Sequence, residues 1–298
     1  MLAPFFCLMN VVRQSGCKIN LLLNVLGRRP DGFHELETVM APVRLYDTLE
    51  FSPNSDGVGF TCSDASLPTD GGNLVVRAAE AFRVAAGLDE GATIHLEKRI
   101  PAAAGLGGGS GNAAAALLGL NEIFEAPLSM EELGEIARGL GSDVPFFLDD
   151  KPALAVGRGE QVELLEPFDA LNGAWLLLVR PGFGVATPWA YRALADFPDA
   201  LNGQPGRARD LVEALRCVDL KSAAGKFYNS LEAPVLRKFP ILAMYGEFLW
   251  ENGAVAALMS GSGSTTFAIA ESQSVAEELA ERFKGKFGES CWLQTLPV

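Results

Sequence analysis

The sequence predicts a fold of mixed helices and strands that is divided into two domains, and three observations support this prediction. The chain has 298 residues, which is the length of about two ordinary domains. Hydrophobic residues make up 49% of it and charged residues 20%, which is the composition of a globular protein. Patterns typical of helices and of strands alternate along the chain, and we predict that the domains span residues 1–165 and 166–298.

The N-terminal half is predicted to begin with a strand that carries a lysine. Residues 17–26 are largely apolar and bounded by glycines, which predicts a buried strand whose one charge is Lys18. Residues 27–32 are rich in turn formers and predict an exposed loop. Apolar side chains at helical spacing then predict a helix over residues 73–86, with Gly87 as its stop signal.

A glycine-rich loop follows the next predicted strand. The alternation of residues 93–98 is typical of a strand, Pro101 interrupts it, and a helix is predicted from about Asn112 to Phe124. A further helix is predicted over residues 130–140. The remaining predicted elements are strands near 153–157 and 174–180, helices near 188–194, 208–216 and 231–250, and strands around 254 and 266.

The net charge limits the class of partner. The chain has 24 basic and 37 acidic side chains, and its net charge of -13 repels nucleic acid. A nucleotide is not excluded, because backbone amides, a helix N-terminus and a bound cation supply positive potential locally. Oligomeric state is not readable from the sequence.

Cysteine and histidine usage favours a cytoplasmic protein without zinc. The five cysteines form no C-x-x-C pair, and the two histidines, His34 and His95, are too few for a recognisable zinc site. No stretch reaches membrane-spanning length, so no membrane partner is expected. The apolar residues 1–12 lack the basic start and cleavage site of a signal peptide, and we interpret them as a stretch that leads into the first strand.

Residues 101–116 place five glycines and one serine where a loop meets a helix. Glycine lets backbone amides approach a ligand, and the helix N-terminus adds unpaired N–H groups, so this stretch predicts a phosphate site. It is not a Walker loop, because no Gly-Lys-Ser/Thr ends it, and Ser110 or Asn112 stands where dinucleotide and hydrolase motifs require glycine. From these residues alone, a glycine turn without a ligand stays an alternative.

The same run, Pro101–Ala116, resembles the ATP loop of the GHMP kinases. Four further segments resemble motifs of that family and follow in its order. They are the lysine motif Cys17–Leu21, the substrate loop Gly27–Leu36, the catalytic aspartate segment Leu140–Phe147 and the third glycine motif Met259–Ser264. The substrate loop narrows the resemblance to the members that phosphorylate a cytidine diphosphate-linked methylerythritol.

The resemblance implies an α+β fold of two domains, with a ribosomal-protein-S5-domain-2-like N-terminal half and a ferredoxin-like C-terminal half. It also implies an ATP-dependent kinase that phosphorylates the 2-hydroxyl of the methylerythritol, with Mg²⁺ as counter-ion to the phosphates. It assigns no protein ligand to the metal ion.

The resemblance implies that Lys18 and Asp143 form the catalytic pair. Phosphoryl transfer depends mainly on positioning and charge stabilisation, so a carboxylate that accepts the hydroxyl proton and a cation beside it are sufficient. Without the family, Asp143 would more often be a helix cap, and Lys18 an edge or snorkelling lysine.

The resemblance also implies residues that bind ATP and the acceptor substrate. Asn112 has the alternative of capping its helix, and Thr187 and Tyr191 have the alternative of ordinary packing. Ser260–Ser264 would shape the site through its turn and amides. The ATP residues are Asn73, Lys98, Pro101, Ala102, Ala103, Ala104, Gly105, Leu106, Gly107, Gly108, Gly109, Ser110, Gly111 and Asn112; the substrate residues are Asn20, Phe33, His34, Asp143, Thr187 and Tyr191.

Three positions depart from the pattern of the family. Gly111 stands where a second serine is usual, which removes a hydroxyl near the phosphates or the metal ion. Phe33 stands where tyrosine is usual, which removes a hydroxyl but keeps the ring surface. Cys17 replaces an alanine of similar packing demand and is assigned no chemistry.

Two other functions are compatible with these motifs. One is another GHMP kinase that acts on a sugar, homoserine or mevalonate, and the substrate loop ending in Phe33 and His34 argues against it. The other is a non-catalytic nucleotide-sensing protein on the same fold, and the presence of both Lys18 and Asp143 argues against that.

Overall fold

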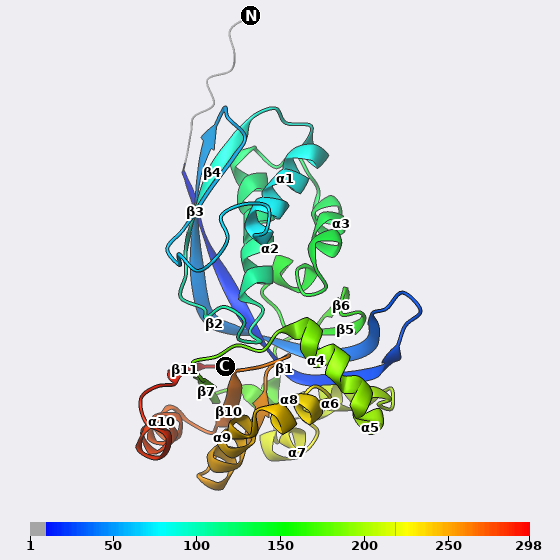
Figure 1. The fold of residues 1–298 in the computed structure, drawn as a ribbon, viewed down its shortest axis with the longest axis vertical. Helices are drawn as coiled ribbons and strands as arrows, with labels where there is room; N and C mark the ends of the chain where they lie inside the picture. Colours follow the sequence, from blue (N-terminus) through cyan, green and yellow to red (C-terminus); the bar gives the residue numbers. More distant parts are fainter. Residues whose placement is uncertain (1–9, 218) are drawn as a thin grey trace, which may run out of the picture. The chain divides into compact units, whose positions relative to one another are not determined.

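The computed structural model describes residues 10–217 and 219–298 and contains two compact units (Figure 1). Unit 1 consists of residues up to Gly16, Leu45–Ile100 and Gly108–Asp150, and unit 2 of Cys17–Arg44, Pro101–Gly107 and Lys151–Val298. We interpret the apolar residues 1–12 as a stretch that leads into the first strand, and residues 1–9 of it lie outside the described part of the chain. The predicted domains, residues 1–165 and 166–298, are consecutive along the chain. The two compact units each combine separate stretches of the chain and do not test this division, which stays a prediction.

Unit 1 is built on antiparallel and parallel strands with three helices on one face (Figure 1). The C-terminal part of β2 pairs antiparallel with β4, and β3 pairs parallel with β4. Its core is apolar, with Phe51 and Phe82 fully buried. The elements are β1 (Val11–Arg28) and β2 (His34–Asn54), which also contribute to unit 2, β3 (Val58–Cys62), β4 (Gly91–Glu97), α1 (Leu74–Ala86), α2 (Gly108–Ile123), α3 (Met130–Leu140) and the 3-10 helix η1 (Pro145–Leu148).

Unit 2 contains a four-stranded antiparallel sheet in the order β11-β7-β10-β9. In the same unit, β5 pairs with β2 and with β6, and β8 pairs with β1. The strands are β5 (Ala153–Gly157), β6 (Gln161–Leu164), β7 (Trp175–Arg180), β8 (Tyr228–Asn229), β9 (Ala256–Met259), β10 (Thr266–Ala270) and β11 (Trp292–Pro297).

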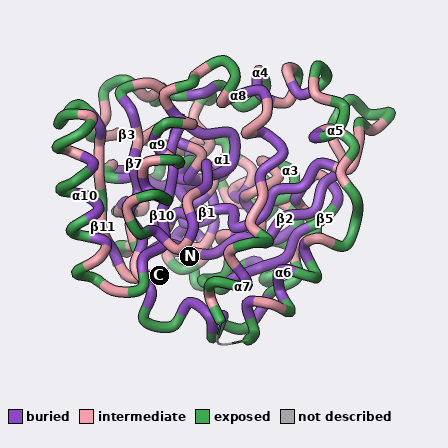
Figure 2. The backbone as a smooth tube through the Cα atoms, turned by 90° about the horizontal axis from the view of Figure 1, so that it is seen from below, coloured by how far each residue is buried: buried purple, intermediate pink, exposed green. Residues whose placement is uncertain are grey.

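Most helices of unit 2 are short, and the two longest, α9 and α10, have 12 and 15 residues. Strand β10 is buried along its length. Helix α10 alternates between buried and exposed residues (Figure 2), and Phe283 is among its buried residues. The helices are α4 (Thr187–Ala193), α5 (Pro198–Leu201), α6 (Arg207–Leu215), α7 (Leu220–Ala224), α8 (Glu232–Lys238), α9 (Pro240–Glu251) and α10 (Gln273–Phe287), with the 3-10 helices η2 (Asp169–Leu171) and η3 (Leu194–Asp196).

Two predicted helices differ from the structure. The single helix predicted over 231–250 is wrong, because α8 ends at Lys238 and α9 begins at Pro240. Proline disfavours helical backbone in the residue before it, and Phe239 has φ -123° and ψ 73°. Helix α2 begins at Gly108 rather than near Asn112, because the glycine run forms its first turn.

Within residues 10–217 and 219–298, no helix combines the length with the apolar character that a membrane crossing requires.

Candidate functional site

Lys18 lies in β1 within unit 2 and is only 3% exposed, which excludes a snorkelling lysine. Its ammonium donates to Asn20 Oδ1, and Asn20 Nδ2 donates to Thr38 Oγ1 at 2.8 Å. Thr38, from β2, in turn donates to the carbonyl of Leu22 at 2.5 Å. These hydrogen bonds contribute to the orientation of the Lys18 side chain, and Asn20, predicted to lie near the substrate, accepts from its ammonium.

Three segments far apart in the sequence meet around Lys18 in unit 2. The backbone N–H of Lys18 donates to Leu106 O at 2.9 Å, which joins β1 to the glycine loop. Ser260 Oγ donates to Gly105 O at 2.9 Å, which joins the same loop to the third glycine motif. Unit 2 therefore brings together the lysine motif, the loop Pro101–Gly107 and the motif Met259–Ser264.

Gly105 occupies a position that no other residue fits. Its φ is +77°, and a Cβ built there would lie 2.1 Å from Ser260 O and 3.0 Å from Gly263 N. The left-handed backbone favours glycine, and the contact requires the absence of a side chain. The loop can approach the third glycine motif only because residue 105 is glycine.

Gly105→Ala is expected to destabilise the protein by about 2–4 kcal/mol and to raise KM for ATP, because the loop or the third glycine motif must move. Thermal unfolding and steady-state kinetics measure the two effects. Gly173→Ala is the matched control, since Gly173 has φ +79° and no atom lies within 4 Å of its added Cβ. The free energy of unfolding of the control should fall by only about 1–2 kcal/mol, because its alanine must adopt the left-handed backbone conformation. Equal effects of the two substitutions would show that the close contact at Gly105 is unimportant.

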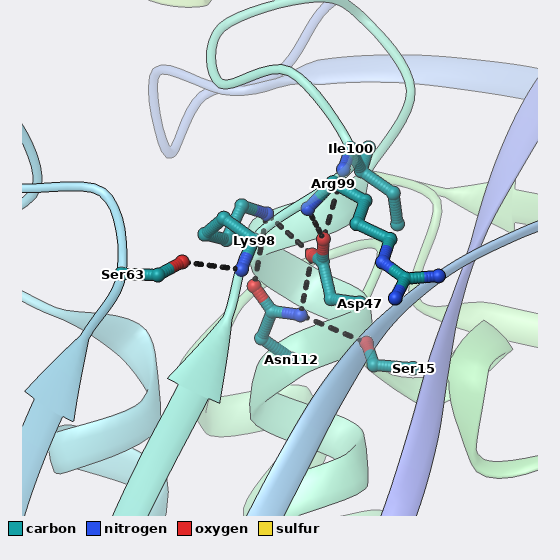
Figure 3. Close-up of polar contacts among 7 residues, drawn as sticks. All are labelled: Ser15, Asp47, Ser63, Lys98, Arg99, Ile100 and Asn112. Carbon is teal, nitrogen blue, oxygen red and sulfur yellow. Dashed lines mark hydrogen bonds and ion pairs between the residues drawn. The ribbon is translucent and has the colours of Figure 1, made fainter.

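Unit 1 provides a helix N-terminus with a cation beside it (Figure 3). The first N–H groups of a helix have no intrahelical partner, so the N-terminus of α2, at Gly108, favours an anion beside it. A Cβ on Gly108 would lie 3.5 Å from Lys98 Nζ, so the ammonium is close to this end of the helix. Lys98 donates to Asp47 Oδ2 and, at 3.3 Å, to Asn112 Oδ1.

Asn112 does not cap its helix, and this alternative is wrong. It is the fifth residue of α2 and is 3% exposed. Its side-chain amide donates to Asp47 Oδ2 and to Ser15 Oγ, each at 2.9 Å. Gly111 beside it is closely packed as well, since a Cβ there would lie 2.4 Å from Gly16 O. The glycine that replaces the family's second serine is therefore required by the packing.

The other two candidates of unit 1 are Asp143 and Asn73. Asp143 lies between α3 and η1, one residue before Val144, which is the N-cap residue of η1. Asn73 is the N-cap of α1, where its Oδ1 accepts from Val75 N at 2.9 Å. Lys18 and Asp143 belong to different units, so their pairing stays a prediction.

The substrate loop of unit 2 presents aromatic rings. The ring centroids of His34 and Tyr191 are 5.1 Å apart, and the Arg158 guanidinium lies 4.6 Å from the centroid of the half-exposed Phe33. Burial lowers the pKa of His34, and the nearby charge of Arg28 lowers it further. The imidazole is therefore neutral at pH 7 and can both donate and accept a hydrogen bond.

Two residues that no sequence motif predicts, Asn229 and Glu232, support the turn of the third glycine motif. Asn229 Nδ2 donates to Met259 O at 2.7 Å and to Gly261 O at 2.8 Å. Glu232 accepts from Met259 N at 2.9 Å, and burial raises the pKa of its carboxyl to about 7 although this hydrogen bond lowers it. Thr187 Oγ1 and Ser262 Oγ, 2.7 Å apart, link this turn to α4.

Comparison with known proteins agrees with these motifs. The GHMP kinases N terminal domain matches residues 73–151, and the GHMP kinases C terminal domain matches residues 207–289. The 4-diphosphocytidyl-2-C-methyl-D-erythritol kinase of Pelotomaculum thermopropionicum is 46% identical over 268 residues, which cover 90% of this chain and 91% of that protein. The protein of the same name from Citrifermentans bemidjiense is 41% identical over 88% of this chain and 90% of its own length.

Solved structures agree at the level of the fold. A crystal structure of 4-(cytidine 5'-diphospho)-2C-methyl-D-erythritol kinase has a TM-score of 0.78 and 38% identity, and the match covers 97% of this chain and 100% of that one. Homoserine kinase from Cytophaga hutchinsonii has a TM-score of 0.72 at 16% identity over 99% of this chain and 95% of that one, which shows a shared fold alone. The chain therefore has the α+β fold of the GHMP kinases and belongs, within them, to the family of 4-diphosphocytidyl-2-C-methyl-D-erythritol kinases.

Proposed function

We propose that this enzyme transfers the γ-phosphoryl group of ATP to the 2-hydroxyl of 4-diphosphocytidyl-2-C-methyl-D-erythritol. The observation that carries the proposal is the assembly around buried Lys18, in which the lysine motif, the glycine loop and the third glycine motif are joined by hydrogen bonds. The family to which the chain belongs consists of proteins named for this substrate.

ATP fits the residues proposed for it. The N-terminus of α2 offers backbone N–H groups, Lys98 adds a positive charge there, and the glycines keep side chains away from the loop. Mg²⁺, as a hard cation that binds oxygen, would neutralise phosphate charge. Among the residues that the structure describes, no three His, Cys, Asp or Glu side chains gather as a metal site. Mg²⁺ is proposed as counter-ion to the ATP phosphates, and no protein ligand is assigned to it.

The catalytic roles follow from the chemistry of the two side chains. Asp143 accepts the proton of the substrate's 2-hydroxyl while the oxygen of that hydroxyl forms a bond to the γ-phosphorus of ATP. At the same time the bond from the γ-phosphorus to the ADP oxygen breaks. The Lys18 ammonium stabilises the negative charge around the transferring group. Asn20 contributes to the orientation of Lys18 by accepting a hydrogen bond from its ammonium.

The acceptor is proposed to bind through its cytosine. The neutral imidazole of His34 can pair with a base edge that offers both a donor and an acceptor. The rings of Phe33 and Tyr191 provide surfaces on which a base can stack. Thr187 lies at the start of α4, and its hydroxyl is held by Ser262.

Substrate-dependent release of ADP tests this function. With ATP and Mg²⁺, the enzyme is expected to release ADP when 4-diphosphocytidyl-2-C-methyl-D-erythritol is added and not when homoserine, mevalonate or a simple sugar is added. Turnover with one of those acceptors instead would favour another GHMP kinase. ATP binding without turnover on any acceptor would favour the nucleotide-sensing alternative.

We also propose the predicted domain boundary and the cytoplasmic location. The two family matches, 73–151 and 207–289, lie on either side of residue 165, which supports two consecutive domains. Cysteine usage supports a reducing compartment, and the net charge of -13 argues against a nucleic-acid partner.

A further inference from the structure

Asp47 is a buried carboxylate that the motifs do not include. It lies in β2 and is fully buried. Its Oδ1 accepts from the backbone N–H groups of Arg99 at 2.7 Å and Ile100 at 2.8 Å. Its Oδ2 accepts from Lys98 Nζ and, at 2.9 Å, from Asn112 Nδ2. Four hydrogen bonds occupy the carboxylate, so Asp47 is not available as a base or as a metal ligand.

The partners of Asp47 are the residues that surround the N-terminus of α2 (Figure 3). Lys98 and Asn112 are both proposed to lie at the nucleotide, and both direct their side chains to the same oxygen of Asp47. The two backbone donors belong to the residues that lead from β4 into the glycine loop. One carboxylate thus sets the position of a cation, an amide and the entry to the loop.

Electrostatics explains why a carboxylate is needed at this place. The N-terminus of a helix carries a partial positive charge, which repels an ammonium beside it. The Lys98 side chain is only 7% exposed, so water does little to offset that repulsion. Asp47 supplies the opposite charge, and the ammonium remains next to the helix end instead of turning toward solvent.

We propose that Asp47 is a positioning residue for ATP, which holds the Lys98 ammonium at the N-terminus of α2 where it meets the phosphates. Asp47 contacts both the cation Lys98 and the backbone that leads into the glycine loop. This role rests on the proposed function of Lys98 toward ATP. The alternative is that the ion pair of Asp47 and Lys98 only stabilises unit 1.

Asp47→Asn is the first test, because the new amide keeps the shape and removes the charge. KM for ATP is expected to rise about 10- to 100-fold, the effect of losing one charged hydrogen bond to a phosphate, while KM for the acceptor changes less than about threefold. The dissociation constant of ATP, measured by calorimetry without turnover, should rise in parallel. Glu37→Gln is the matched control, since Glu37 is also a buried carboxylate that accepts from an asparagine and from two backbone N–H groups, those of Gly206 and Ala208.

The double variant Asp47→Asn, Lys98→Met separates positioning from stability. It removes both charges of the buried ion pair, so no unpaired charge is left, and the test stays informative if Asp47→Asn alone does not fold. If Asp47 acts through Lys98, ATP binds the double variant and Lys98→Met equally, within about threefold. A further tenfold loss in the double variant would overturn the proposal. So would an unchanged ATP affinity in folded Asp47→Asn or in Lys98→Met, or an equal loss of affinity in Glu37→Gln. Wild-type enzyme that binds ATP without turnover would instead contradict the proposed function.

Discussion

Asp143→Asn is expected to lower kcat by about 10³-fold while KM for ATP stays within a factor of about three. The amide has nearly the shape of the carboxylate, but it cannot accept the proton that the 2-hydroxyl loses during transfer. The loss therefore appears in the transition state and not in the binding of ATP. Substrate-dependent ADP release under saturating ATP and acceptor measures kcat.

Asp149→Asn is the matched control for this substitution. Asp149 is exposed and directly follows η1, so the same chemical change is made a few residues away. Its kcat should equal that of the wild type within about twofold, as for most exposed positions. If Asp143→Asn kept kcat within about tenfold of the wild type, Asp143 would not be the base, although the enzyme could still be this kinase.

Local pattern predicts much of the fold where one face of an element is buried. The helix predicted over 130–140 and the strand predicted over 153–157 have the same bounds in the structure. Helix α1 begins after its cap Asn73, as its apolar spacing predicts. The single helix predicted over 231–250 is wrong because the apolar spacing continues past Pro240, whereas the helical backbone is interrupted at Phe239, the residue before this proline.

Motifs predict the segments of the site, but not the residues that hold them. The amino-acid sequences of their motifs identify Lys18, the glycine loop and Ser260–Ser264, and unit 2 brings these segments together. Asp47 and Thr38 lie within the long strand β2, where a carboxylate or a hydroxyl has no distinctive spacing. Their importance comes from hydrogen bonds to residues far away in the sequence, which a local pattern does not contain.

Lys18→Met is expected to lower kcat by about 10²- to 10³-fold, the usual cost of losing one group that stabilises transition-state charge. Methionine has a similar length and is apolar, so the change removes the charge from a position that is 3% exposed. Unfolding experiments on Lys18→Met check that the loss of activity is not a loss of folding, since Asn20 Oδ1 loses its donor in this variant. A large loss of activity in a protein of undiminished stability points to catalysis rather than to folding.

Thr38→Val tests whether the effect belongs to the ammonium or to the hydrogen bonds that orient it. The substitution keeps the shape of the side chain, removes the acceptor of the Asn20 amide and leaves Lys18 in place. Because Asn20 Oδ1 still accepts from the ammonium, kcat should fall by less than about tenfold, although two neutral hydrogen bonds are lost, the one from Asn20 and the one to the Leu22 carbonyl. If Thr38→Val were as damaging as Lys18→Met, orientation by this network would account for the loss, and the charge of Lys18 would not need to act on the phosphoryl group. If only Lys18→Met is severe, the ammonium itself stabilises the transferring phosphate, as its place among the three motifs predicts.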